Sequence, residues 1–344
     1  MVSVENCRKA ILNASKGKRR RSAVNTILKD IDRYSLELSE RMKTLSFVTP
    51  YRPRIIHDGL SGKTREIQVP AFFPDQCAHH AIVQVIGPII SASMYFWSCA
   101  NTPGKGIDLA CIGVERATVR NKKHVRYCVK CDIRKFYPSV PHDLLKARFR
   151  EKIKDEKALA ILDLVVDSHE KGLPIGNYTS PWFAEFYLQP LDNYIKQELH
   201  AKYYVRYADD IVIIGTNKRK MQKMLKGLIS KTKELGLEIK DNYQLFPIYD
   251  GKRGRKIDFV GRCFALGYAI VRKRRALALM RQSRKIRKLQ TKGVRIPYRM
   301  ASGFISRCAC FKHTKSKGLK ETYYDTVNIE NLKEVIRSYG MAHK

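Results

Sequence analysis

Two adjacent acids interrupt an apolar run in the stretch VRYADDIVI, residues 205–213. An ionised carboxylate does not enter an apolar strand without a partner, because the loss of its hydration is costly. The apolar segments on either side have the length of short strands, so we predict a β-hairpin over residues 203–214. Asp209 and Asp210 lie at its bend, and the question is what they hold there.

A third acid has a similar setting upstream. Residues 125–131 have the apolar character of a strand, and this strand ends at Asp132. If the strands pair, Asp132 and Asp209 face each other. Buried carboxylates at strand ends either form ion pairs with arginine or bind hard divalent cations. Mg²⁺ is often held by one or two carboxylates together with substrate phosphates, and a pair of such ions stabilises both oxygens of a phosphoryl transfer.

The charge of the chain fits a polyanionic partner. The 344 residues include 67 Lys and Arg against 32 Asp and Glu, which gives a net charge of +35. A compact fold with this charge repels itself unless it meets a polyanion, and nucleic acid is favoured over an anionic membrane. We find no signal peptide and no apolar run of membrane-spanning length. We therefore expect a cytoplasmic protein without a membrane partner, whose binding weakens steeply with salt.

Periodicity and helix-capping residues predict further elements around these strands. In chain order they are two helices over residues 3–45 around a basic loop at 16–21, a helix over 75–91, a helix capped by Ser139, strands at 237–240 and 256–259, and a basic helix over 272–289.

Six segments resemble, in order and spacing, the motifs of reverse transcriptases. They are Lys63–Ile67 followed by Pro70, Asp132–Tyr137, Leu173–Pro181, Tyr207–Asp210, Leu235–Lys240 and Ile257–Gly261. The resemblance implies an α+β right-hand polymerase fold, with fingers, an antiparallel palm sheet and a short helical thumb. It divides the chain into a basic helical extension (1–48), fingers (49–124, with 145–172 partly fingers), a palm with the YADD hairpin (125–265) and a basic thumb with a tail (266–344).

The resemblance also implies roles for individual residues. Asp132, Asp209 and Asp210, with the carbonyl of Ile133, would hold two Mg²⁺ ions, for which Mn²⁺ can substitute. Around the incoming nucleotide, Lys63 and Arg65 would neutralise the triphosphate, Tyr137 would exclude a 2′-hydroxyl, Ile175 and Gly176 would line the site, and Lys240 would assist pyrophosphate departure. Nucleic-acid phosphates would contact two basic groups, Lys18, Arg19, Arg20 and Arg21 at the N-terminus and Arg284, Lys285, Arg287 and Lys288 in the thumb.

The position before Gly176 bears on the type of reverse transcriptase. Many members of the family have Gln there, and this chain has Ile175. An apolar residue in this position resembles the reverse transcriptases of diversity-generating retroelements, which copy template adenines poorly. Pro181 and Arg262 depart from that group, and reverse transcriptases of antiphage defence systems and retrons have similar cores. The implied partners are a dedicated structured non-coding RNA, a cDNA primer–template, dNTPs and, in the retroelement group, a small basic accessory protein.

Three other classes of function remain open from the residues. A non-catalytic RNA-binding scaffold with the same fold would carry the same charge but would tolerate loss of the acids. A polymerase that extends DNA would not require RNA. An RNA polymerase with a similar palm would not depend on Tyr137 for its choice of sugar.

Overall fold

Four antiparallel strands form the sheet that carries the three acids. The computed structural model describes residues 1–57 and 64–341. The strand order is β4-β5-β3-β6, with β3 at Tyr127–Asp132, β4 at Tyr203–Tyr207, β5 at Asp210–Gly215 and β6 at Gln244–Pro247. The predicted hairpin is confirmed, because β4 and β5 pair antiparallel and only Ala208 and Asp209 join them.

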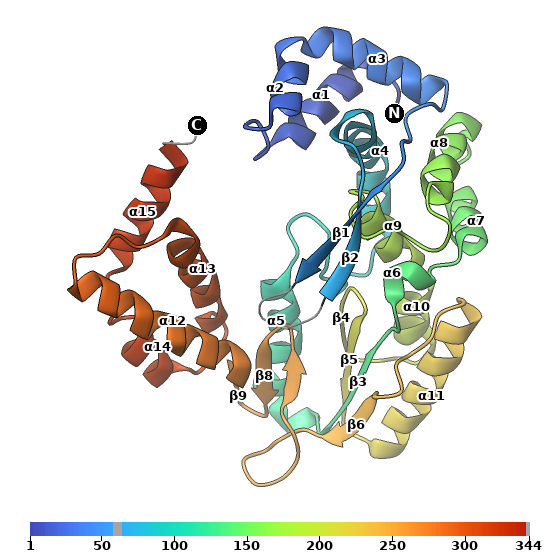
Figure 1. Ribbon diagram of the computed structural model, residues 1–344. Helices are drawn as coiled ribbons and strands as arrows, with labels where there is room; N and C mark the ends of the chain where they lie inside the picture. The colour runs from blue at the N-terminus through green and yellow to red at the C-terminus, as the bar shows by residue number, and fades with distance from the viewer. Residues whose placement is uncertain (58–63, 342–344) are drawn as a thin grey trace.

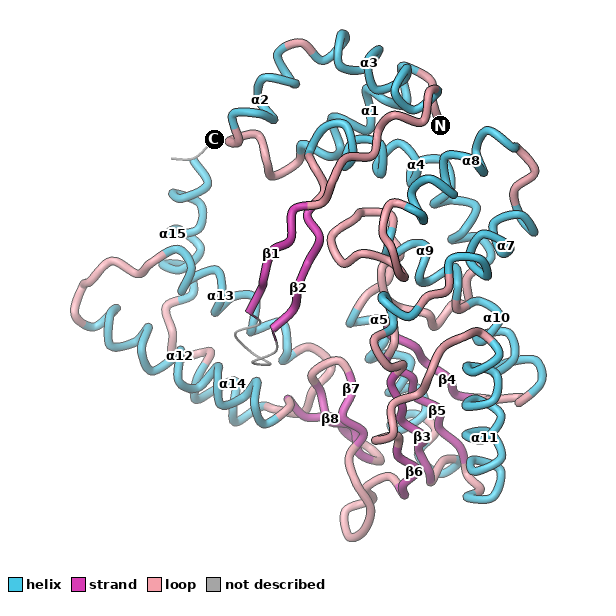
Figure 2. The backbone as a smooth tube through the Cα atoms, turned by 45° about the vertical axis from the view of Figure 1, so that its right-hand side comes forward, coloured by secondary structure: helices cyan, strands magenta, loops and turns pink. Residues whose placement is uncertain are grey.

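Both faces of this sheet are covered, which explains why its strands are almost continuously apolar. Helix α11 (Lys218–Glu234) contacts β3 and β5 on one face, and α5 (Ile107–Glu115) contacts β4 on the other (Figures 1 and 2). Alternate residues of β5 therefore point into two different cores, Ile213 into the first and Val212 into the second. The acids lie at the strand ends, where this cover stops.

The N-terminal half contains an exposed pair of antiparallel strands, β1 (Arg52–His57) and β2 (Thr64–Val69). Helices α1 (Val4–Ser15) and α3 (Ile31–Lys43) pack on each other and on α4 (Cys77–Ser93). The prediction of one helix through residues 27–38 was wrong, because the helix is interrupted at Asp30, with φ −128° and ψ 51°, and α2 ends at Lys29 after starting at Ser22. Aspartate competes with the backbone for hydrogen bonds and favours such junctions over helix interiors.

Two further expectations differ from the structure. Ser139 does not cap a helix; it ends α6 (Phe136–Ser139), and its hydroxyl donates to the carbonyl of Arg134. The next helix begins at His142, after Pro141. Residues 237–240 form a single β-bridge, between Ile239 and Ile133, instead of the expected strand. Strand β3 has already ended at Asp132 and provides no further residues for a longer pairing.

Four more α-helices follow α6 in the chain before β4 begins. They are α7 (His142–Lys152), α8 (Glu156–Asp167), α9 (Ser180–Tyr187) and α10 (Gln189–Asn193).

The C-terminal part has its own small core. A three-stranded antiparallel sheet of β7 (Ile257–Phe259), β8 (Arg262–Ala265) and β9 (Tyr268–Val271) leads into four helices. These are α12 (Lys273–Thr291), α13 (Tyr298–Cys308), α14 (Lys317–Tyr323) and α15 (Ile329–Met341), coloured orange to red in Figure 1. Leu279, Phe304 and Leu332 are among their shared buried residues.

None of the helices over the described residues has the length and apolarity needed to cross a bilayer.

Candidate active site

The three acids meet at one end of the palm sheet. Asp132, the last residue of β3, lies directly opposite Asp210, the first residue of β5, and not opposite Asp209 as expected from the sequence, because Asp209 belongs to the turn. Asp209 follows Ala208 in the turn, and its carbonyl accepts a hydrogen bond from the Ile133 N–H at 3.2 Å. The register of two strands therefore brings together residues that are distant in the sequence.

Lysine side chains are the cations beside these carboxylates. The Lys240 Nζ lies 3.8 Å from an Asp132 oxygen and 3.9 Å from an Asp209 oxygen, which is too far for a normal hydrogen bond. The Lys240 N–H donates to the Asp132 carbonyl at 2.8 Å and so fixes the backbone there. Asp210 differs from the other two, because Lys130 donates to it at 2.9 Å.

The electrostatics of the site favour an additional cation. Burial raises the pKa of Asp209, and the charge of Asp132 raises it further, while Lys240 and Arg65 oppose the shift. Burial also raises the pKa of Asp210 to about 6, against the lowering effect of Lys130. Asp132 and Asp209 therefore repel each other, and the charges of Lys240 and Arg65 offset this only in part. A bound cation would relieve the remaining repulsion.

The residues present fit Mg²⁺ shared with a substrate. Across residues 1–57 and 64–341, no group of three or more His, Cys, Asp and Glu side chains is arranged to hold a metal ion. Asp132 and Asp209 nevertheless supply hard oxygen ligands, and their side chains are 31% and 40% exposed. Two carboxylates that remain open to solvent suit an ion that keeps waters and binds substrate phosphates. Asp210 is less available, because Lys130 already pairs with it.

Tyr137 and the loop at residues 172–179 lie together. The Leu173 N–H donates to the Tyr137 carbonyl at 2.8 Å, and the Tyr137 hydroxyl lies 3.4 Å from the Asn101 amide nitrogen. Burial raises the pKa of Tyr137. Gly176 has φ +144°, and a Cβ at this position would lie 2.0 Å from the Gln68 carbonyl oxygen, so only glycine allows this approach to β2.

The remaining predicted nucleotide-site residues are on β2 or directly before it in the sequence, and in the loop at residues 172–179. The Ile175 carbonyl accepts from the Gln68 N–H at 2.8 Å, so the loop is attached to β2 through its main chain. Arg65 is on β2 and contributes to the electrostatics of Asp209. Lys63 lies outside the described residues.

The two predicted nucleic-acid-binding groups are separate. Arg284, Lys285, Arg287 and Lys288 are all exposed on α12. In the N-terminal loop Arg19 and Arg21 are exposed, while the Lys18 Nζ lies 5.7 Å from the centre of the Phe72 ring. The Arg20 guanidinium lies 5.8 Å from the centre of the Tyr339 ring on α15, so this loop contacts the C-terminal helix.

A buried arginine that the sequence did not mark as a site residue supports the turn that carries Asp209. Arg206 is fully buried in β4 and donates two hydrogen bonds to Asp192, at 2.8 and 2.6 Å, and one to Glu185 at 2.8 Å. Burial alone would lower its pKa, but the two carboxylates outweigh burial and raise it. Arg206 also donates to the Ala208 carbonyl at 3.1 Å. Ala208 has φ +52°, a strained conformation for a non-glycine residue, and this bond helps to hold it.

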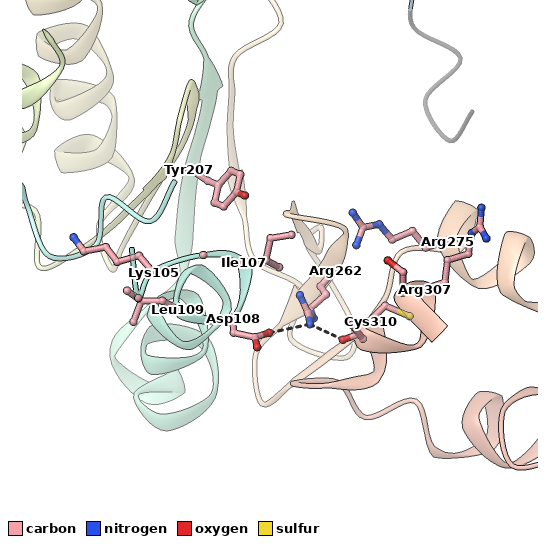
Figure 3. A pocket seen from close by; sticks show the side chains of 13 residues that line it. Lys105, Ile107, Asp108, Leu109, Tyr207, Arg262, Arg275, Arg307 and Cys310 are labelled. Atoms are coloured by element: carbon pink, nitrogen blue, oxygen red, sulfur yellow. Dashed lines mark hydrogen bonds and ion pairs between the residues drawn. The ribbon is translucent and has the colours of Figure 1, made fainter. Parts of the chain in front are cut away.

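A second buried arginine, Arg262, occupies a position at which this chain departs from the retroelement group. Arg262 on β8 donates to the carbonyls of Ala309 and Lys312, at 3.1 and 2.9 Å, and lies 3.6 Å from Asp108. It thereby joins the small C-terminal sheet to the end of α13 and to α5. A cavity of about 770 Å³ opens beside it, lined by Tyr207 and by residues of α12 and α13 (Figure 3).

The comparison with protein families identifies the family to which the chain belongs. The sequence model of the family described as "Reverse transcriptase (RNA-dependent DNA polymerase)" matches residues 57–243, more than half of the chain. The chain belongs to the reverse transcriptase family. The matched segment of this reverse transcriptase contains Asp132, Asp209 and Tyr137.

Curated relatives of this reverse transcriptase match only part of its length. The retron Ec73 reverse transcriptase of Escherichia coli is 32% identical over 143 residues, covering 38% of this chain and 45% of that protein. A protein of Schizosaccharomyces pombe described as an uncharacterized 91 kDa protein in a cob intron is 28% identical over 160 residues, covering 43% of this chain and 19% of that protein. The chain thus spans less than half of the length of these relatives.

Solved structures support the same fold. Apo telomerase from Candida tropicalis superposes with a TM-score of 0.53 at 14% identity, covering 87% of this chain and 61% of that one. Telomerase from Candida albicans, in complex with a TWJ fragment of telomeric RNA, has a TM-score of 0.51 at 10% identity, covering 85% and 66%. Together with the family match, these similarities confirm the predicted right-hand polymerase fold. The domain boundaries and the roles of individual site residues remain predictions.

Proposed function

We propose that this chain is an RNA-directed DNA polymerase that makes cDNA by two-metal-ion nucleotidyl transfer. The observation that carries the proposal is the placement of Asp132 and Asp209 around one lysine at the open end of a reverse transcriptase palm. In phosphoryl transfer the protein acts mainly by positioning and by electrostatic stabilisation, and these carboxylates suffice to anchor the ions. Bound Mg²⁺ would stabilise the attacking and leaving oxygens.

The other site residues act on the incoming nucleotide. Arg65 on β2 neutralises the triphosphate, together with Lys63, for which the sequence predicts the same role. Tyr137, held against the loop by the Leu173 N–H, forms an aromatic wall beneath the sugar and excludes a 2′-hydroxyl. Lys240 lies close to both metal-binding carboxylates, where its ammonium group serves the departing pyrophosphate.

Primer extension on a heteropolymeric RNA template tests this function. We expect the chain, a DNA primer, dNTPs and Mg²⁺ to give cDNA complementary to the RNA, and we expect EDTA or prior RNase treatment to remove the product. Synthesis that persists without RNA would favour a polymerase that does not copy RNA. No synthesis with any template, primer or metal would favour an RNA-binding scaffold.

The exposed cations of α12 are proposed to hold the template–primer through its phosphates. Changing Arg284, Lys285 and Arg287 to Gln should weaken binding and reduce the slope of log affinity against log salt by about 2 to 3 units, because each phosphate contact contributes about 0.9. Titration of a labelled RNA–DNA duplex at several salt concentrations measures this slope. Changing Lys220, Lys223 and Lys226, exposed on α11 behind the palm, is the control with the same change in charge. Equal slopes for the two triple variants would contradict the assignment.

The biological role has two candidates. An apolar Ile175 beside Gly176 supports a diversity-generating retroelement, with synthesis that is error-prone at template adenines and with a small basic accessory protein as a partner. Similarity to the retron Ec73 reverse transcriptase supports a retron-like or antiphage defence role, in which cDNA is copied from an associated structured non-coding RNA. Both roles share the same chemistry and require the same acids.

Ile175→Gln separates these roles. If the retroelement role holds, a glutamine amide that braces the templating pair with one hydrogen bond, worth about 1 kcal/mol, should lower misincorporation opposite adenine about fivefold. Sequencing of cDNA made from one RNA by the wild type and the variant measures the error rate. Ile175→Leu keeps an apolar side chain and is the control. An error spectrum that does not respond to glutamine would favour the retron-like or defence role.

A further inference from the structure

An aromatic stack lies beside the proposed nucleotide site, on the side of the N-terminal helices. The rings of His80 on α4 and Tyr178 are nearly parallel, at 11°, with their centres 3.9 Å apart. Tyr178 is 40% exposed although it is a large aromatic residue. Because one face of its ring lies against His80, the exposed area belongs to the other face and the rim.

The backbone on both sides of Tyr178 is anchored. Asn177 donates from its amide to the Tyr51 hydroxyl at 2.7 Å, and the Thr179 hydroxyl lies 3.1 Å from a ring nitrogen of the buried His79. Gly176, two residues before Tyr178, lies against β2. The ring is therefore held in a fixed place relative to the incoming-nucleotide site, as a preformed stacking surface requires.

Positive charge surrounds this stack. A cavity of about 470 Å³ is lined by His80, Tyr178 and Trp182 and also by Lys16, the first residue of the basic loop at 16–21. Helices α1 and α9, which flank the cavity, both pack on α4 (Figure 2). Burial, together with Lys18 and Lys16, lowers the pKa of His80 to about 4, so the imidazole is neutral at pH 7 and serves as a stacking partner rather than a counterion.

The two side-chain amides that line this cavity already have partners. The Asn13 amide donates to the Gln84 carbonyl oxygen at 2.7 Å, and Gln84 donates to Asn6, which lies outside the cavity lining. Reading the edge of a base with these amides would therefore require existing hydrogen bonds to break. An aromatic face next to cationic side chains is the combination that binds single-stranded nucleic acid with little preference for sequence, through stacking and phosphate contacts.

We propose that the His80–Tyr178 stack and the adjoining lysines bind an unpaired nucleobase of the RNA template before it reaches the site of synthesis. The inference rests on the proposed function, because it assumes an RNA template. It gives the basic loop at 16–21, and Lys16 in particular, a specific strand to contact. It also assigns roles to Tyr178 and His80 that phosphate contacts alone would not require.

Binding of two primer–templates by the full chain tests this site. Both have the same RNA–DNA duplex, and the RNA extends beyond it by one nucleotide or by eight. We expect the longer overhang to bind wild type at least about tenfold more tightly, and Tyr178→Leu to reduce this gain about tenfold, the effect of one lost stack. Tyr178→Phe keeps the ring and should keep the gain. All three proteins should bind the short overhang within about twofold of each other, which also shows that they are folded.

An overhang of abasic nucleotides separates stacking from charge. On this strand Tyr178→Leu should have no effect, whereas Lys16→Gln should weaken binding of both the abasic and the normal overhang. Tyr178→Leu that weakens short, long and abasic overhangs alike, or that weakens none of them, would overturn the proposal. A wild type that prefers the long overhang but incorporates no dNTP would contradict the proposed function and leave this site standing. A wild type that incorporates dNTPs but does not prefer the long overhang would contradict this site alone.

Discussion

Asp209→Asn is expected to lower the rate of dNTP incorporation at least about 1,000-fold, which corresponds to about 4 kcal/mol of transition-state stabilisation. An amide at this position keeps the shape of the side chain but removes the charge that is proposed to anchor a divalent ion beside Asp132. The affinity for RNA should remain within about twofold, because the phosphate contacts are proposed to lie on α12 and on the basic loop. Single-turnover incorporation and RNA titration on the same preparations measure both quantities.

Asp143→Asn is the matched control for this experiment. Asp143 is an exposed acid in the first turn of α7, outside the proposed site, and the substitution makes the same change of charge. Its incorporation rate should equal that of the wild type. If Asp209→Asn retained activity, Asp209 would have no place in the mechanism, and synthesis would have to depend on other residues.

Arg206→Met is expected to lower the free energy of unfolding by about 3 to 5 kcal/mol. The substitution leaves Glu185 and Asp192 buried at 1% exposure each, without the cation that both carboxylates contact. It also removes the hydrogen bond to the Ala208 carbonyl, so the turn that carries Asp209 loses a support. Urea denaturation followed by circular dichroism measures the loss of stability.

A neutral version of the same cluster separates charge from shape. Combining Arg206→Met with Glu185→Gln and Asp192→Asn removes all three charges, and most of the lost stability should return. Incorporation should stay below the wild-type rate in this triple variant, because the bond to Ala208 is still missing. A single Arg206→Met variant that loses less than about 1 kcal/mol would contradict the view that this buried ion cluster supports the palm.

The sequence predicted that the acids converge, because the features that place each of them are found in its immediate sequence neighbourhood. Asp132 ends an apolar strand and Asp209 lies at the bend of an apolar hairpin, so strand pairing alone brings them to one end of a sheet. Arg206 is also a charge within an apolar strand, so the same rule would have predicted that its side chain has buried acidic partners. The sequence does not identify Glu185 and Asp192 as those partners. Both lie in a helical segment whose pattern is typical of ordinary core and surface residues.

Other features depend on contacts between distant segments. Nothing in the local pattern around His80 or Tyr178 indicates that their rings stack, because the contact arises only when the loop before α9 packs on α4. The pairing of Lys130 with Asp210 depends on the register between β3 and β5. The pattern of apolar residues does not reveal the interruption at Asp30, because Ile27 and Ile31 keep helical spacing on either side of it.

Direct metal binding by the wild type and by Asp132→Asn tests the central claim. Mn²⁺ titrations followed by electron paramagnetic resonance, with a primer ending in a dideoxynucleotide and the next dNTP present, report on the ions before any chemistry occurs. The wild type and Asp143→Asn should bind Mn²⁺ equally, and Asp132→Asn and Asp209→Asn should each bind it at least about tenfold more weakly, a difference of about 1.4 kcal/mol. Equal Mn²⁺ affinity in all four proteins would contradict the assignment of these carboxylates as the ligands on which DNA synthesis depends.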